Sequence, residues 1–164
     1  DVALHVAQTL ANSFGDRMKV PAAIGKMVEA GMLGRKNGLG FYRHAKSKEP
    51  QPNQRAELFV RDLAARNRAR EELQERMVFL MVNEAACCLE EEIVTEPADV
   101  DFAMIMGVGF APFRGGPLRY ADTLGAAKLV GAMEHLVAGG AAHFEPCALL
   151  CSMAEEGKTF YPKH

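Results

Sequence analysis

The stretch "RMVFLMVNEAACCLEEEIVTEPADVDFAMIMGVGFAPFRGGPLRYADTLG", residues 76–125, decides the fold because its apolar residues recur at helical spacing. The helical spacing of apolar residues becomes stronger from Leu73 onward. It predicts a helix with an apolar stripe made of Met77, Leu80, Met81, Cys88 and Leu89. Three glutamates, Glu90–Glu92, crowd the end of this helix, where the helix dipole disfavours negative charge. We therefore expect this end to be solvated or paired with a neighbouring cation.

The rest of the stretch also predicts helices. A short helix follows "TEPAD", with Thr95 or Asp99 as its N-cap, and glycines and prolines then predict a loop over residues 107–117. Residues 117–140 predict one or two further helices, and residues 145–157 predict the last one. No alternating apolar run of useful length indicates a strand. The predicted fold class is therefore all-α.

Two helices are also predicted near the start of the chain. The first covers residues 2–14, with an apolar stripe of Val2, Val6, Leu10 and Phe14. The second begins at Pro21, ends at Gly31 or Gly34, and buries Ile24, Met27, Val28 and Leu33. Residues 45–57 are polar and proline-containing, which predicts a linker, and the balanced arginines and acids of residues 58–77 predict an exposed helical surface.

Composition bounds the class of protein. The chain has 164 residues, of which 49% are apolar, and a net charge of −2, so no basic surplus favours nucleic acid or an anionic membrane as a partner. Four cysteines are too few for a disulfide scaffold, which favours a reduced, cytoplasmic setting. No apolar run approaches the roughly 20 residues that span a bilayer. Because the chain begins inside an amphipathic helix, we expect it to be an excised segment of a longer polypeptide.

An internal similarity suggests a repeat. "KMVEAG", residues 26–31, aligns with "SMAEEG", residues 152–157, and an aromatic pair follows each. The same offset places "DVALHVAQTL" over "AKLVGAMEHL", residues 127–136. We predict two tandem helical repeats, the first truncated: residues 1–44, a linker over 45–70, and residues 71–164. Chance similarity between helix-rich segments is the alternative.

The glycine-rich stretch "GMLGRKNGLGFYRH", residues 31–44, has two interpretations. A phosphate loop of the Walker type needs a lysine and a hydroxyl after its last glycine, and neither is present. A Rossmann loop lies between a strand and a helix, whereas here a helix precedes and a polar linker follows. The glycines are therefore expected to form a tight turn that returns Phe41 and Tyr42 onto the preceding helix.

A second glycine-rich stretch, residues 107–117, is the better candidate site. Its small residues let the backbone approach a ligand closely, and the guanidinium groups of Arg114 and Arg119 suit phosphate or carboxylate. The alternative is a connection between helices with solvated arginines.

Other polar residues have structural interpretations. His143, Cys147 and Cys151 have the spacing of zinc ligands on one helix face, but no fourth ligand is evident, so we expect no metal. Asn83 and Glu84 lie mid-helix and are expected to hydrogen-bond to a neighbouring helix end; the alternative is that they face an active site completed elsewhere. No arrangement of residues indicates a catalytic triad.

In this order, "MVNEA", "PADVDFAM" and "GVGFAPFRGGPLRYAD" make residues 76–125 resemble the second C-terminal helical repeat of the alpha subunits of bacterial fatty acid β-oxidation complexes. "DVALHVAQTLANSFGDRM" and "GRKNGLGFY" resemble the later half of the first such repeat, as in 3-hydroxyacyl-CoA dehydrogenases. The resemblance implies tandem repeats of the 3-hydroxyacyl-CoA dehydrogenase C-terminal type. It leaves out only the variable linker.

The resemblance also implies an activity for the parent chain. Such a parent fuses an enoyl-CoA hydratase domain, a Rossmann domain that binds NAD, and these repeats, and it oxidises L-3-hydroxyacyl-CoA to 3-ketoacyl-CoA. The family's catalytic His–Glu pair and glycine loop belong to the Rossmann domain, and no matching motif is present here. We therefore expect no catalytic residue in this chain, and NAD to be bound by the missing domain.

Substrate-binding residues are implied at Met106, Gly107, Gly109, Phe110 and Arg114. In related subunits a tyrosine before the Gly-x-Gly-Phe turn contacts substrate; Met106 stands at that position and lacks the hydroxyl. The implied partners are the Rossmann and hydratase domains, the acyl-CoA substrate and a thiolase beta subunit. The alternative is a helical dimerisation or thiolase-docking module without a substrate role.

Overall fold

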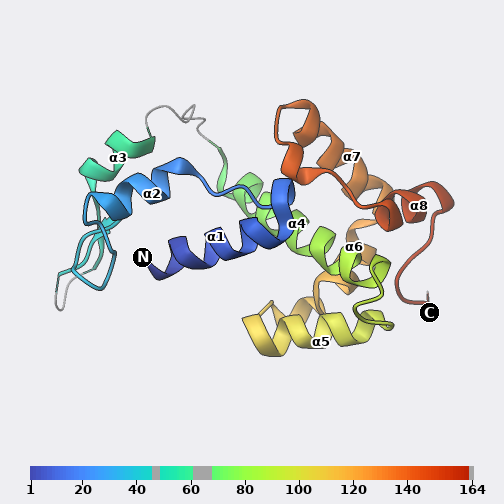
Figure 1. Cartoon of the computed structure of the whole chain (residues 1–164). Helices are drawn as coiled ribbons and strands as arrows, with labels where there is room; N and C mark the ends of the chain where they lie inside the picture. The colour runs from blue at the N-terminus through green and yellow to red at the C-terminus, as the bar shows by residue number, and fades with distance from the viewer. Residues whose placement is uncertain (46–48, 61–67, 163–164) are drawn as a thin grey trace. The chain divides into compact units, whose positions relative to one another are not determined.

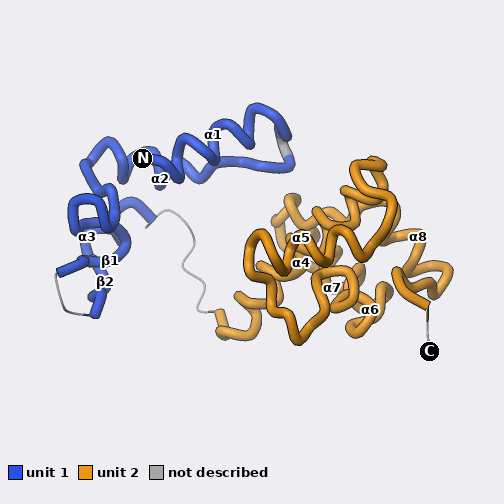
Figure 2. Tube along the Cα trace, turned by 90° about the horizontal axis from the view of Figure 1, so that it is seen from below, with its two compact units in different colours: residues 1–67 blue, residues 68–164 orange. Residues whose placement is uncertain are grey.

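The computed structural model describes residues 1–45, 49–60 and 68–162. They belong to two compact units, residues 1–67 (unit 1) and 68–164 (unit 2), coloured separately in Figure 2. Helices dominate both units, and the described residues form a single sheet of two short antiparallel strands. The predicted all-α fold class is confirmed. No described helix is both long and apolar enough to cross a membrane.

Unit 1 is small and has a thin core. Its elements are α1 (Val2–Phe14), a 3₁₀ turn (Gly15–Arg17), α2 (Ala22–Glu29), β1 (Tyr42–Arg43), β2 (Gln51–Pro52) and α3 (Gln54–Val60). Only Met27, Met32 and Ala56 form its buried cluster, with Leu39 and Phe59 packed against them. Helix α2 ends as predicted, because Gly31 adopts a left-handed φ of 73° just after the helix.

The first glycine-rich stretch is a self-filled turn. The Asn37 side chain occupies it: its amide nitrogen donates to the Gly31 carbonyl at 2.6 Å, and its amide oxygen accepts from the backbone N–H groups of Leu33 and Leu39 at 3.3 Å. A Cβ on Gly40 would lie 2.8 Å from the Cα of Gly34, so the two backbone segments touch. The glycines form a tight turn, as predicted, and the Asn37 side chain holds it together.

Two predictions for unit 1 are wrong. Phe41 and Tyr42 do not return to the helix: they are 53% and 51% exposed, and Tyr42 instead pairs in β1. The segment expected as a linker contains β2 and α3, because buried Asn53 fastens it to the glycine turn by donating to the Gly40 carbonyl at 2.7 Å. Part of the exposed surface expected over 58–77 lies outside the described residues.

Helix α1 leaves its apolar stripe exposed. The helix is predicted correctly, but it buries no residue, and its four stripe residues retain between 36% and 71% of their exposure: Val2, Val6, Leu10 and Phe14. An amphipathic helix is stabilised mainly by burying its apolar face. Among the described residues of unit 1 the stripe is therefore an exposed apolar surface, apart from the Arg17 guanidinium 5.5 Å from the Phe14 ring centroid.

Unit 2 is a helical bundle with one continuous core. Its helices are α4 (Arg70–Glu90), α5 (Pro97–Val108), α6 (Pro117–Leu124), α7 (Ala126–Ala138) and α8 (Ala148–Glu156), with 3₁₀ turns at Pro112–Arg114 and Ala142–Phe144. Figure 1 shows α5 on one side of α4 and α6, and α7 and α8 on the other. Completely buried Val82, Leu118 and Met133 lie at its centre.

Helix α4 has apolar residues on two faces, and the sequence prediction chose the wrong one in part. The buried face is formed by Phe79, Val82, Asn83, Ala85 and Ala86. The expected stripe is exposed at Leu73, Met77 and Met81, whereas Leu80, Cys88 and Leu89 are half-buried against the core. Periodicity alone cannot choose between two apolar faces of one helix.

The same helix holds the start of α8. Asn83 donates its amide to the Glu145 carbonyl and accepts from the Cys147 backbone N–H, both at 2.9 Å. This confirms the expectation that Asn83 fixes a neighbouring helix end. Glu90 accepts from the Leu149 N–H at 2.8 Å, so this carboxylate meets the positive end of α8 and not a cation.

The start of α6 depends on a carboxylate from α5. Gly116 occupies the N-cap position and has no side chain, and Pro117 follows at the first helical position without an N–H. Buried Asp101 takes over the capping: its carboxylate accepts from the N–H groups of Leu118 at 2.7 Å and Arg119 at 3.0 Å. Neither Thr95 nor Asp99 caps α5, whose N-cap is Glu96.

Gly116→Ala tests this junction. Gly116 has φ 108°, and a Cβ there would lie 2.3 Å from Asp101 Cγ. We expect the free energy of unfolding to fall by roughly 2–4 kcal/mol, from backbone strain and a displaced cap. Urea unfolding measures it. Gly131→Ala, in α7 with open space around it, is the control and should be neutral or slightly stabilising. Equal effects of the two substitutions would contradict the assignment.

Candidate functional site

The predicted site residues surround the end of α5. Met106 and Gly107 lie in its last turn, so the helix extends two residues into the segment predicted as a loop. Gly109 ends the helix in the left-handed conformation, with φ 73° and ψ 33°. Phe110 is half-buried, and its N–H donates to the Met104 carbonyl at 3.1 Å. The structure thus brings four of the five residues into one helix terminus.

Arg114, the fifth residue, stacks on aromatic rings. Its guanidinium carbon lies 5.5 Å from the ring centroid of Phe113 and 4.7 Å from that of Tyr120 in α6. Cation–π stacking of this kind orients a guanidinium without using its N–H donors. The donors therefore stay available for an anionic or carbonyl group.

An apolar surface adjoins these residues. Phe102 and Met106, one turn apart in α5, are 66% and 70% exposed, and we call them the outer face of α5. Val108 at the end of the helix and Phe113 in the following 3₁₀ turn are also exposed, at 69% and 84%. The inner face of the helix carries buried Val100 and Asp101. A helix that is apolar on all sides is typical of one that is buried on all sides. Exposed apolar surface of this kind is typical of contacts with a ligand or another protein.

The carboxylate beneath this surface belongs to a network that sequence reasoning missed. The Tyr161 hydroxyl donates to Asp101 at 2.7 Å, and the Arg119 guanidinium lies 3.8 Å from the Tyr161 ring centroid. Asp122 accepts the backbone N–H groups of Phe160 and Tyr161, both at 2.9 Å. The C-terminal segment is therefore fastened to α5 and α6. The available signals were the aspartates in "DVDF" and "RYAD" and the recurring aromatic pair.

This network is structural chemistry. Burial, the hydrogen bond to Asp101 and the nearby carboxylates raise the pKa of Tyr161, so its hydroxyl stays protonated and donating. Asp101 accepts from three donors, two backbone N–H groups of α6 and the Tyr161 hydroxyl. The network positions the end of α5 from below.

Tyr161→Phe removes the hydroxyl alone. We expect the free energy of unfolding to fall by about 1–3 kcal/mol, because a bond to a buried charge is lost. Thermal or urea unfolding measures it. Tyr42→Phe, at a half-exposed tyrosine of unit 1, is the matched control and should change stability by less than about 0.5 kcal/mol. An unchanged free energy of unfolding in Tyr161→Phe would show that the hydroxyl does not stabilise the network.

The histidine and cysteines singled out as possible metal ligands are not gathered into a site. His143 lies in the 3₁₀ turn before α8, Cys147 is the N-cap of α8, and Cys151 lies inside it. Within the described ranges no three potential ligands cluster. The four cysteines form no disulfide among the described residues, and burial raises the pKa of the Cys147 thiol to about 12.

The Cys147 pKa predicts slow alkylation. At pH 8 the thiol should react with iodoacetamide at least roughly thirtyfold more slowly than an unperturbed cysteine, after allowance for its greater intrinsic nucleophilicity. Mass spectrometry of digests over time measures it, with the urea-unfolded chain as control. Because the pKa of Cys147 is raised in the folded chain, the contribution of its neutral thiol to the free energy of unfolding is complete below pH 9. This contribution is lost as the pH rises toward 12. Equal rates in folded and unfolded chains would contradict this.

Comparison with known proteins now identifies the class. The 3-hydroxyacyl-CoA dehydrogenase C-terminal domain family matches residues 1–44 and 73–161. The chain belongs to this family.

Two relatives match almost the whole chain. The chain is 43% identical over 163 residues to the fatty acid oxidation complex subunit alpha of Shewanella amazonensis and 40% identical over 165 residues to that of Shewanella frigidimarina. These matches cover 98% and 99% of the chain. The chain spans only 23% of the length of either relative.

Two solved structures share the fold. One is 3-hydroxybutyryl-CoA dehydrogenase from Escherichia coli K12, with a TM-score of 0.70 and 20% identity over 96% of this chain and 49% of that one. The other is the dehydrogenase part of multifunctional enzyme 1 from C. elegans, with a TM-score of 0.61 and 22% identity over 91% of this chain and 36% of that one. At these identities the likeness establishes the fold alone.

Proposed function

We propose that this chain is the C-terminal part of an NAD-dependent 3-hydroxyacyl-CoA dehydrogenase, within a parent that also carries an enoyl-CoA hydratase domain. The parent would oxidise L-3-hydroxyacyl-CoA to 3-ketoacyl-CoA in fatty acid β-oxidation. The family match supports the dehydrogenase, and the relatives named as alpha subunits support the multidomain parent. Free cysteines support a reducing compartment, for which we propose the cytoplasm.

NAD, which accepts the hydride when bound, does not fit the residues of this chain. A dinucleotide needs backbone N–H groups at a helix N-terminus after a parallel strand. Here the side chain of Asn37 occupies the first glycine turn. The two described strands, each of two residues, form one antiparallel pair. We therefore assign NAD and the catalytic base to a separate Rossmann domain of the parent.

The chain's own contribution would be the outer face of α5 and the residues around it. The single observation that carries this proposal is the 70% exposure of Met106 in the last turn of α5, a helix with apolar residues on both its buried and its exposed sides. These side chains would exclude water from an acyl thioester, while Arg114, held on Tyr120, would meet a carbonyl or phosphate oxygen. Gly107, Gly109 and Phe110 would let substrate approach the helix end closely.

Equivalent bonds in the two units support the tandem repeat. The Met32 N–H donates to the Met27 carbonyl at 2.8 Å, and the Lys158 N–H donates to the Met153 carbonyl at 3.0 Å. Both acceptor residues are buried methionines, and a left-handed glycine, Gly31 or Gly157, lies in each turn. The family also matches the chain in two separate segments.

A helical interaction module is the second candidate. It is favoured by the exposed stripe of α1, which has no predicted ligand contact. In this case the chain would mediate dimerisation or docking to a thiolase without contacting substrate.

Kinetics of a full-length alpha subunit that carries this segment separate the candidates. We expect Met106→Ala to raise KM for L-3-hydroxyacyl-CoA by about three- to tenfold with little change in kcat, because an apolar substrate contact is lost. Met77→Ala, at an exposed methionine of α4, is the matched control. The isolated 164-residue chain should bind NAD no better than an unrelated protein by calorimetry.

Two other results would count against this proposal. Unchanged dehydrogenase kinetics together with lost assembly in Met106→Ala would favour the interaction module. Micromolar NAD binding by the isolated chain would overturn the assignment of NAD to another domain.

A further inference from the structure

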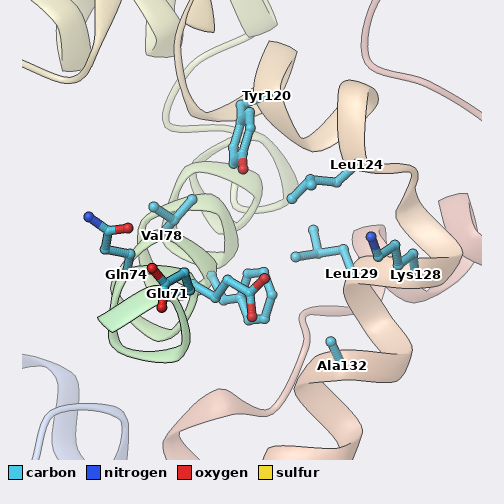
Figure 3. Close-up of a pocket in the computed structure, with 10 residues that line it drawn as sticks. Glu71, Gln74, Val78, Tyr120, Leu124, Lys128, Leu129 and Ala132 are labelled. Carbon is cyan, nitrogen blue, oxygen red and sulfur yellow. The ribbon is translucent and has the colours of Figure 1, made fainter. Parts of the chain in front are cut away.

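Unit 2 contains a cavity that the proposed substrate surface does not use. It has a volume of about 300 Å³ and lies between α4, α6 and α7. Figure 3 shows labelled side chains of α4 on one side, those of α7 on the other, and Tyr120 and Leu124 of α6 above them. Ligand pockets of this kind occur between the helices of bundles, at volumes from about 300 Å³ upward.

The floor of the cavity is apolar. It is lined by Val78, Phe79, Leu124, Leu129 and Ala132. Phe79 and Leu129 are also buried members of the unit 2 core, so the floor is fixed by packing on its far side. A preformed apolar floor of this size accepts a short alkyl chain or ring without rearrangement.

The rim is polar and unevenly charged. Glu71 and Glu75, one helical turn apart, line the cavity from α4 together with Gln74, and Lys128 lines it from α7. Glu71, Glu75 and Lys128 form no ion pair with any residue in the described ranges. Like charges at this helical spacing repel each other, so a cation between the two carboxylates would be stabilising. A carboxylate on the α4 side would be repelled.

We propose that this cavity is a binding site for a small cationic amphiphile, with an alkyl tail on the apolar floor and an ammonium group against Glu71 and Glu75. Lys128 is the one cation among the lining residues, and it faces the acids from the opposite side, which disfavours a second positive charge there. The site thus discriminates by head group: ammonium first, a neutral hydroxyl next, and carboxylate last. This proposal does not rest on the dehydrogenase assignment.

The cavity also touches the candidate substrate surface at one residue. Tyr120 lines the cavity, and its ring carries the Arg114 guanidinium at 4.7 Å. Tyr120 thus borders both the cavity and the Arg114 guanidinium.

Three probes with the same tail test the site: octylammonium, octanol and octanoate. The 164-residue chain contains three tyrosines and no tryptophan, so ring resonances of Tyr120 report on the cavity while those of Tyr42 and Tyr161 serve as internal references. We expect saturable shifts at Tyr120, with octylammonium binding about tenfold more tightly than octanoate. Added salt should shrink this ratio, because the rim charges are exposed.

Two substitutions locate the site. Ala132→Phe fills the cavity and should abolish binding of all three probes, whereas Ala138→Phe, at an exposed alanine at the end of the same helix, should leave binding unchanged. Glu75→Lys changes only the rim and should invert the preference between octylammonium and octanoate. It keeps the test decisive if Ala132→Phe fails to fold.

Any of three outcomes would overturn the proposed binding site. The proposal is overturned if no probe saturates the Tyr120 shift at millimolar concentration, or if octanoate binds most tightly to the unsubstituted chain. It is also overturned if Glu75→Lys leaves the order of the probes unchanged. None of these results bears on NAD binding or on dehydrogenase kinetics, so the two proposals fail separately.

Discussion

The carboxylate of Asp101 is the contact on which unit 2 depends most. A buried charge is costly unless donors surround it, and here two N–H groups of α6 and the Tyr161 hydroxyl do so. The positive end of the α6 dipole adds a favourable field. One side chain thereby joins α5, α6 and the C-terminal segment. A Cβ at residue 116 would overlap the Asp101 carboxylate, so this carboxylate can occupy its place only if residue 116 is glycine.

The start of α8 follows the same design. Its N-cap, Cys147, makes no side-chain capping bond, and the Asn83 amide and the Glu90 carboxylate of α4 meet its backbone instead. In both places a helix start is satisfied by a side chain from another helix, which couples secondary structure to packing. The outer face of α5 belongs to the same helix as Asp101, which forms one of these junctions. A surface built on a fixed helix end can hold its side chains in a defined geometry.

Local signals in the sequence were enough for most of the helices and not for their surroundings. Periodicity and glycines located α1, α2 and α8, because these features act within a few residues. They could not show that Asp101 caps α6, since the partners are 17 and 18 residues apart and meet only after packing. Nor could they show which apolar face of α4 is buried, or that Asn53 orders β2 and α3. The cavity between α4, α6 and α7 left no local signal either.

The two glycine-rich stretches show how similar composition serves different physics. In the first, Gly34 and Gly40 touch, and Asn37 fills the turn with its own hydrogen bonds. The N–H groups of Leu33, Gly34 and Leu39 donate within the turn itself, so they are not available to a phosphate. In the second, Gly116 makes room for a carboxylate that belongs to the chain itself, and Gly109 ends a helix. What this second stretch leaves open is the Arg114 guanidinium, because stacking on Tyr120 uses only its face. The residue types that attract attention in a sequence are thus consumed by the fold in the first stretch, while in the second the donors of one arginine remain free to meet a ligand.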